Sequence, residues 1–170
     1  MPKVIRLYVR GIDVLNRTVG RCVMYLVFAM MGILLFAAIT RSVFNIPFLW
    51  VIEMAQFTMA AYYLLGGAYT LQNQAHVRMD LLYEHWSPRK KAFADSVTAF
   101  CLIFYLVVLF YGGISSSQYA LEYDQRNYSA WAPPMAPIKI IMSVGILLML
   151  LQAVAIFFRD LATALNRDIQ

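Results

Sequence analysis

Four long uncharged runs dominate the chain, and clusters of charged residues separate them. The runs cover residues 22–40, 54–75, 96–121 and 140–158. An α-helix rises 1.5 Å per residue, so runs of this length form helices of about 29–39 Å, comparable with a hydrocarbon core of roughly 30 Å. We therefore predict an all-α integral membrane protein with four transmembrane helices.

With their flanking residues, the predicted spans are 22–40, 48–75, 96–121 and 139–158, all within a single membrane domain of residues 1–170. We expect a cytoplasmic connection with a short surface helix over 76–95, an ordered periplasmic loop over 122–138 and a short tail over 159–170. The proline-rich composition of the loop opposes a regular helix there, with Pro137 counted as part of the loop. The third run is long enough that we expect it to leave the lipid near Ser115–Gln118.

Residues 1–21 have the pattern of an amphipathic helix. Apolar residues three or four apart alternate with charged ones; the apolar set is Ile5, Tyr8, Ile12, Leu15 and Val19, and the charged set is Lys3, Arg6, Arg10, Asp13 and Arg17. A helix with a basic polar side typically lies along a membrane surface. The alternative is a solvated extension whose charges only set the topology.

The distribution of basic residues predicts the orientation of the spans. Of the 14 lysines and arginines, eleven fall before span one, between spans two and three, or after span four, and three fall in the other two connections. Cytoplasmic connections carry the excess of basic residues, so both termini should face the cytoplasm.

Composition excludes several classes of function. With 62% hydrophobic and 14% charged residues, the chain has no room for a soluble catalytic domain. The net charge of +5 does not indicate nucleic acid, because the basic residues flank apolar runs. Cys22 and Cys101 lack the spacing of a disulfide or zinc site, and we find no catalytic motif. We predict neither an enzyme nor a bound cofactor.

Two groups of polar residues are candidate sites. Glu53 is the only acid inside a predicted span, which raises ion coupling as a hypothesis; we favour a polar contact at the helix end or between subunits. His76 and Asp80 are four residues apart, with Glu84 one turn further on, so they could share a helix face and hold a metal. We favour a hydrogen-bonded anchor at the inner interface. Haem is disfavoured because the histidines, His76 and His85, lie outside the spans.

The order of these features resembles the small membrane subunit of tripartite ATP-independent periplasmic (TRAP) transporters. The resemblance covers nearly the whole chain and includes the Trp50-x-x-Glu53 entry to span two, the Gly66–Gly67 pair, the exit from His76 to Asp80, and Pro88. A segment rich in tryptophan and proline then leads into span four.

The resemblance implies a role in secondary uptake across the bacterial inner membrane. In that family a periplasmic binding protein delivers an organic acid, such as a C4-dicarboxylate or sialic acid, to a large elevator-type subunit driven by sodium. The small subunit is a scaffold, and substrate and sodium bind to the large subunit. Membrane lipids are the other expected partner, and no nucleic acid is expected.

Two hypotheses about this chain's residues follow. The predicted contacts with the large subunit are Trp50, Glu53, His76, Arg78 and Asp80. The predicted docking residues for the binding protein are Tyr123, Arg126, Tyr128 and Trp131.

Two other classes remain as alternatives. A small multidrug exporter also has four spans, but it depends on an acid in the first span, which is uncharged here. A quinone-linked or thiol-redox membrane enzyme is opposed by the placement of the cysteines and histidines. A periplasmic binding protein and a large membrane protein encoded beside this chain would favour the transporter.

Overall fold

A computed structural model describes residues 3–46, 48–73 and 88–164. Five helices occupy most of this part of the chain: α1 (Lys3–Met24), α2 (Leu26–Phe44), α3 (Trp50–Gln72), α4 (Pro88–Glu122) and α5 (Ala136–Ala164). The described residues form no named strand, only one isolated bridge between Arg126 and Pro134. The prediction of an all-helical protein is therefore confirmed for these ranges.

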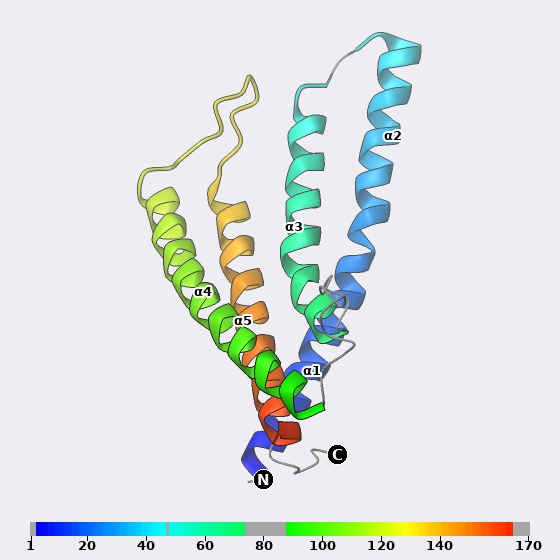
Figure 1. Ribbon diagram of the computed structural model, residues 1–170. Helices are drawn as coiled ribbons and strands as arrows, with labels where there is room; N and C mark the ends of the chain where they lie inside the picture. The colour runs from blue at the N-terminus through cyan, green and yellow to red at the C-terminus, as the bar shows by residue number, and fades with distance from the viewer. Residues whose placement is uncertain (1–2, 47, 74–87, 165–170) are drawn as a thin grey trace.

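The helices form two antiparallel pairs, α2 with α3 and α4 with α5 (Figure 1). Helix α5 lies at the centre, because it packs against α4, α3 and α1. We call the end at which α1 begins and α5 ends the basal end. The opposite end carries the connection from α2 to α3 and the loop from α4 to α5, and we call it the loop end.

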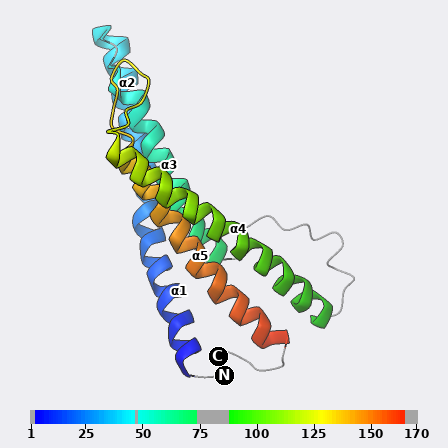
Figure 2. The same ribbon diagram turned by 90° about the vertical axis from the view of Figure 1, so that its left-hand side faces the viewer.

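Helix α1 continues into α2 almost in line, with an interruption at Tyr25 (Figure 2). The Tyr25 N–H donates to the Cys22 carbonyl, three residues back, and the Phe28 N–H donates to Tyr25 in the same way. This tight turn is typical of a helix junction. The amphipathic helix expected over 1–21 corresponds to α1, which extends to Met24 and packs against α3 and α5. Its position at a membrane surface stays a prediction.

The buried side of α1 is rotated from the predicted apolar side. Its buried residues are Val9, Asn16, Gly20 and Val23, whereas Leu15 is exposed. The predicted positions therefore lie only in part against the rest of the chain.

Three segments of the described chain are long and apolar enough to cross a membrane: Ile5–Phe44, Val97–Glu122 and Ala136–Arg159. Helix α3, which corresponds to the predicted span two, is not among them. The mean hydropathy of α3 is too low because the helix contains polar residues, a tyrosine pair and a glycine pair. Among these are Glu53, Gln56, Tyr62–Tyr63 and Gly66–Gly67. The structure thus supports three membrane-capable segments, compared with the four predicted.

Helix α4 is longer than the predicted third span. It begins at Pro88, where a missing backbone N–H costs nothing in the first helical turn, and it continues to Glu122. Residues 88–95, expected in a separate surface helix, belong to α4, and the rest of that connection, up to residue 87, lies outside the described residues. Helix α5 begins at Ala136, so Pro137 lies in its first turn, where proline is tolerated for the same reason. The prediction that Pro137 belongs to the loop was wrong.

Close contact between α3 and α5 depends on glycine. A Cβ atom added at Gly145 would lie 2.7 Å from the Leu64 carbonyl oxygen, and one added at Gly67 would lie 2.9 Å from the Met149 sulfur. Small residues allow helix backbones in membranes to approach closely, and Gly67 of the Gly66–Gly67 pair has this role here. The two helices run in the same direction through this contact.

Candidate functional site

Trp50 joins α3 to α2 at the loop end. Its ring lies 6.4 Å from that of Phe36 on α2 and 6.2 Å from that of Phe48, and the Phe36 and Phe48 rings stack at 5.8 Å between centroids. Aromatic pairs at these separations stabilise beyond their buried area. Trp50 remains half-buried, so part of its indole is accessible to a partner or to lipid.

Glu53 lies in the first turn of α3 and is only 7% exposed. Its Oε2 atom is buried and has no hydrogen-bond partner among the described residues. Leu64 on α3 lies beside Gly145 on α5, and the two helices are parallel. Eleven residues before Leu64 is Glu53, and eleven residues before Gly145 is the loop that precedes α5. Glu53 is therefore level with that loop. The carboxyl therefore faces the bundle, where the positive end of the α3 dipole favours it.

The loop from Tyr123 to Met135 is held closed by backbone hydrogen bonds. The Met135 N–H donates to the Gln125 carbonyl at 2.8 Å, and the Asn127 N–H donates to the Pro133 carbonyl at 3.0 Å. Asp124 and Ala132 turn the chain with positive φ angles of 44° and 47°. The loop is therefore an ordered hairpin-like projection.

All four residues predicted to dock the binding protein are exposed on this loop: Tyr123, Arg126, Tyr128 and Trp131. Arg126 forms an exposed ion pair with Asp124 at 3.2 Å, which contributes at most about 1 kcal/mol. The Tyr123 ring packs on Tyr119 at 4.6 Å between centroids. The loop thus presents three aromatic side chains and a cation to its surroundings.

A cluster of polar groups links α4 to α5 just below the loop. The Ser117 hydroxyl is 3.0 Å from the Ser143 hydroxyl and 3.0 Å from the Lys139 carbonyl oxygen. The Lys139 ammonium donates to Gln125 Oε1 at 2.6 Å and to the Ser116 carbonyl at 3.4 Å. Ser117, in the run where we expect the helix to leave the lipid, is buried and bonds to α5. The exit point itself stays a prediction.

A second cluster, which we call the basal polar cluster, joins α1, α3 and α5. It comprises Asp13, Asn16, Gln72, Gln152 and Arg159. Asn16 Nδ2 donates to Gln152 Oε1 at 2.6 Å, and Gln152 Nε2 donates to Asp13 Oδ1 at 3.0 Å. Asn16 is 1% exposed and Gln152 is 0% exposed. These hydrogen bonds satisfy part of the buried amide groups, whereas Asn16 Oδ1 and Gln72 Oε1 are buried without a hydrogen-bond partner among the described residues.

Asp13 is the centre of the basal polar cluster. Its second carboxylate oxygen accepts from Arg159 at 2.8 Å, and its backbone carbonyl accepts from Gln72 Nε2 at 3.1 Å. Sequence reasoning grouped Asp13 with the arginines on the polar side of α1 and missed the cluster. The available signal was a glutamine inside the last apolar run, because a buried amide requires a partner.

The structure leaves part of the predicted contact set undescribed. Trp50 and Glu53 lie together at the loop end, but His76, Arg78 and Asp80 lie outside the described residues, as does the candidate metal face with Glu84. Within the ranges that the structure covers, no group of three or more histidine, cysteine or acidic side chains could hold a metal ion. Cys22 and Cys101 are free thiols.

Comparison with known proteins gives a family. A comparison with curated proteins found no relative. A family model described as "Tripartite ATP-independent periplasmic transporters, DctQ component" matches residues 30–163, which include α3, α4, most of α2 and nearly all of α5. This match extends over more than half of the chain, and it includes the polar cluster between α4 and α5 and the residues that α3 and α5 contribute to the basal polar cluster. The chain therefore belongs to the DctQ family, the small membrane component of the TRAP transporters.

Proposed function

We propose that this chain is the scaffold subunit of a sodium-coupled uptake system for an organic acid such as a C4-dicarboxylate or sialic acid. In this proposal a periplasmic binding protein delivers the substrate, and a large elevator-type membrane subunit, braced by this chain, carries it across the bacterial inner membrane. The family match over residues 30–163 is the observation that carries the proposal. Substrate and sodium bind to the large subunit, and both termini of this chain face the cytoplasm.

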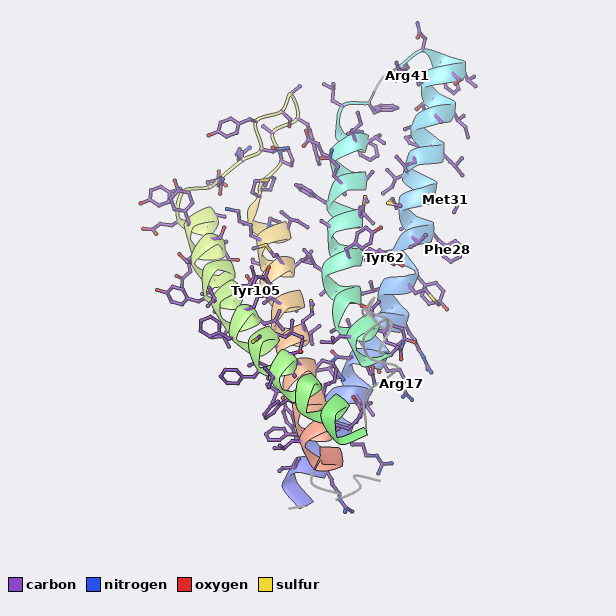
Figure 3. The ribbon with its side chains drawn as sticks, viewed as in Figure 1. Arg17, Phe28, Met31, Arg41, Tyr62 and Tyr105 are labelled. Atoms are coloured by element: carbon purple, nitrogen blue, oxygen red, sulfur yellow. The ribbon has the colours of Figure 1, made fainter. Side chains whose placement is uncertain are left out.

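The apolar surface of the bundle supports a bracing role. Helix α2 has no buried residue, and many large apolar side chains of α4 are exposed. Figure 3 shows Phe28 and Met31 on the outer side of α2 and Tyr105 on the outer side of α4. Such surface within a membrane is covered by lipid or by a neighbouring subunit. A helical bundle of this size thus has ample surface for a larger membrane partner.

The contact with the large subunit is proposed at α3. Trp50 offers an accessible indole, and large aromatic side chains of this kind are frequent anchors in interfaces. Glu53 fixes the depth of the helix end, and His76, Arg78 and Asp80 extend the contact at the other end of the same segment.

The binding protein is proposed to dock on the loop from Tyr123 to Met135. Exposed tyrosine, tryptophan and arginine are the residue types most enriched at protein interfaces. Closure of the loop by its own hydrogen bonds means that little conformational entropy is lost on binding.

Paired tryptophan variants test the two contacts separately. The chain is co-expressed with the large membrane subunit encoded beside it, and both subunits are purified in mild detergent. We expect Trp50→Ala to reduce recovery of the large subunit and Trp131→Ala to leave recovery unchanged. In uptake assays with added binding protein, we expect Trp131→Ala and Tyr128→Ala to raise the binding-protein concentration needed for half-maximal rate.

Three results would contradict the proposal. The first is recovery of the large subunit that is unaffected by Trp50→Ala combined with replacement of Glu53 and Asp80. The second is uptake of an organic acid by vesicles containing this chain alone, because a scaffold has no transport activity of its own. The third is uptake by the reconstituted complex that is independent of a sodium gradient.

A further inference from the structure

Four arginines form a narrow stripe along α1. Arg6, Arg10, Arg17 and Arg21 are all exposed. At 3.6 residues per turn they fall within about 60° of one another around the helix axis. None of the four makes an ion pair or hydrogen bond within the part of the chain that the structure describes.

The basal polar cluster leaves this stripe without an acidic neighbour on its own helix. Asp13 is the only acid of α1, and it turns towards α5, where Arg159 and Gln152 bind its two carboxylate oxygens. The pairing neutralises Asp13 and fixes the rotation of α1. The outward stripe is therefore uniformly cationic, and its ligand should be anionic.

An exposed apolar stripe borders the arginines on the side away from the bundle. Leu7, Val14 and Tyr25 lie on this stripe, and each is more than half exposed. Around α1 the order is thus the buried face, the arginine stripe and the apolar stripe. Apolar side chains beside snorkelling arginines are typical of a helix at the boundary between lipid headgroups and acyl chains.

The position of α2 gives the depth of the nearest arginines. Its 19 residues make a helix of about 29 Å, which matches one hydrocarbon core. Arg21 and Arg17 precede Leu26 by five and nine residues, or about 8 and 14 Å along the axis. With the reach of an extended arginine side chain, these distances correspond to the headgroup region. Arg10 and Arg6 lie about 10 and 16 Å further from the hydrocarbon core than Arg17 does.

We propose that Arg17 and Arg21 form a binding site for an anionic glycerophospholipid at the basal end of the molecule. Each guanidinium donates paired hydrogen bonds to phosphate oxygens, and the apolar stripe contacts the acyl chains. A lipid fits better than an acidic protein surface, because the apolar and cationic stripes lie side by side at the depth of one leaflet. The site depends only on this chain and goes beyond its role as a scaffold.

The test measures lipid binding to the full chain, alone and with the large subunit. Phosphatidylglycerol and, separately, phosphatidylcholine are added to protein in neutral detergent, and bound lipids are counted by native mass spectrometry. We expect the unmodified chain to bind phosphatidylglycerol at least tenfold more tightly than phosphatidylcholine. The double change Arg17→Gln and Arg21→Gln should weaken phosphatidylglycerol binding about thirtyfold, which corresponds to about 1 kcal/mol for each arginine.

Two matched variants serve as controls. The double change Arg6→Gln and Arg10→Gln removes the same charge from the same stripe further from the hydrocarbon core, so binding should fall less than threefold. The double change Arg17→Lys and Arg21→Lys keeps the charge but loses the paired hydrogen bonds, so its affinity should lie between those of the unmodified chain and the Arg17→Gln and Arg21→Gln variant. This intermediate affinity separates lipid binding from a folding defect.

Three outcomes would overturn the inference. One is equal affinity of the unmodified chain for the two lipids. Another is an equal loss of affinity in the two glutamine variants, which would indicate a diffuse charge effect. The third is loss of the large subunit from the Arg17→Gln and Arg21→Gln variant with unchanged lipid binding, because the stripe would then contact an acidic protein surface. Failure of the scaffold proposal would be seen separately, as lack of co-purification by the unmodified chain.

Discussion

Replacement of Gly145 by alanine tests whether α3 and α5 meet as closely as the structure shows. The added Cβ would lie 2.7 Å from the Leu64 carbonyl oxygen and 2.9 Å from the carbonyl carbon. Ordinary contacts begin at 3.4 Å, so the helices must separate locally by about 0.7 Å, the difference between 3.4 and 2.7 Å. The obstructing atoms belong to a helix backbone, so a change of side-chain rotamer cannot relieve the clash.

The expected cost of Gly145→Ala follows from overpacking. Forcing one extra carbon into a well-packed contact costs about 1–3 kcal/mol. For a chain of this size, 1 kcal/mol changes the melting temperature by roughly 2–4 °C. We therefore expect the melting temperature in detergent to fall by about 2–12 °C, measured by intrinsic fluorescence and checked by size-exclusion chromatography of the heated sample.

Two other glycines calibrate this result. A Cβ added at Gly112 meets nothing within 4 Å, so Gly112→Ala should leave the melting temperature unchanged or raise it, because alanine favours helix. Gly67→Ala meets the Met149 thioether at 2.9 Å, and this flexible side chain can move, so the loss should be intermediate. If Gly145→Ala melts at or above the temperature of Gly112→Ala, the described contact between α3 and α5 is wrong.

Three further predictions concern the polar groups and the loop. Gln152→Leu leaves the buried Asn16 amide without its acceptor and should destabilise the protein by about 1–3 kcal/mol. Leucine at both positions should recover part of that loss in thermal melts, and a double variant less stable than either single one would contradict the pairing. Ser143→Ala removes a link between α4 and α5 and should cost about 0.5–2 kcal/mol, whereas Ser115→Ala, at an exposed position, should cost nothing measurable. Tyr128→Cys is made in a variant whose two natural cysteines are replaced by serine. It should react with an impermeant thiol reagent added from the periplasmic side. Labelling only from the cytoplasmic side would contradict the predicted orientation of the spans.

The basal polar cluster and the arginine stripe are consequences of one rotation of α1. A rotation of about a quarter turn would move Asn16 out of the bundle and bury guanidinium groups against it, which is costly without acidic partners. Hydrogen bonds from Gln152 and Arg159 instead select the rotation in which Asp13 is inside. Variants of Gln152 should therefore affect lipid binding by α1 as well as stability.

The amino-acid sequence is sufficient to predict that this protein is helical and roughly where its apolar helices begin and end. Long runs of uncharged residues predict helices, because a segment in lipid must satisfy its backbone hydrogen bonds internally. The sequence also indicated the family, because the order and spacing of the motifs can be recognised without a structure. The position of Pro137 was misjudged because proline is tolerated in the first helical turn as well as in loops.

The association of the helices could not be predicted from the sequence. Asn16 and Gln152 are 136 residues apart in the chain, so local periodicity contains no information about their hydrogen bond. The direction of Asp13, the burial of Ser117 and the contact between Gly145 and Leu64 likewise depend on a second helix. Periodicity places a residue on a face of its own helix, but packing against the other helices decides which face is buried and which faces lipid.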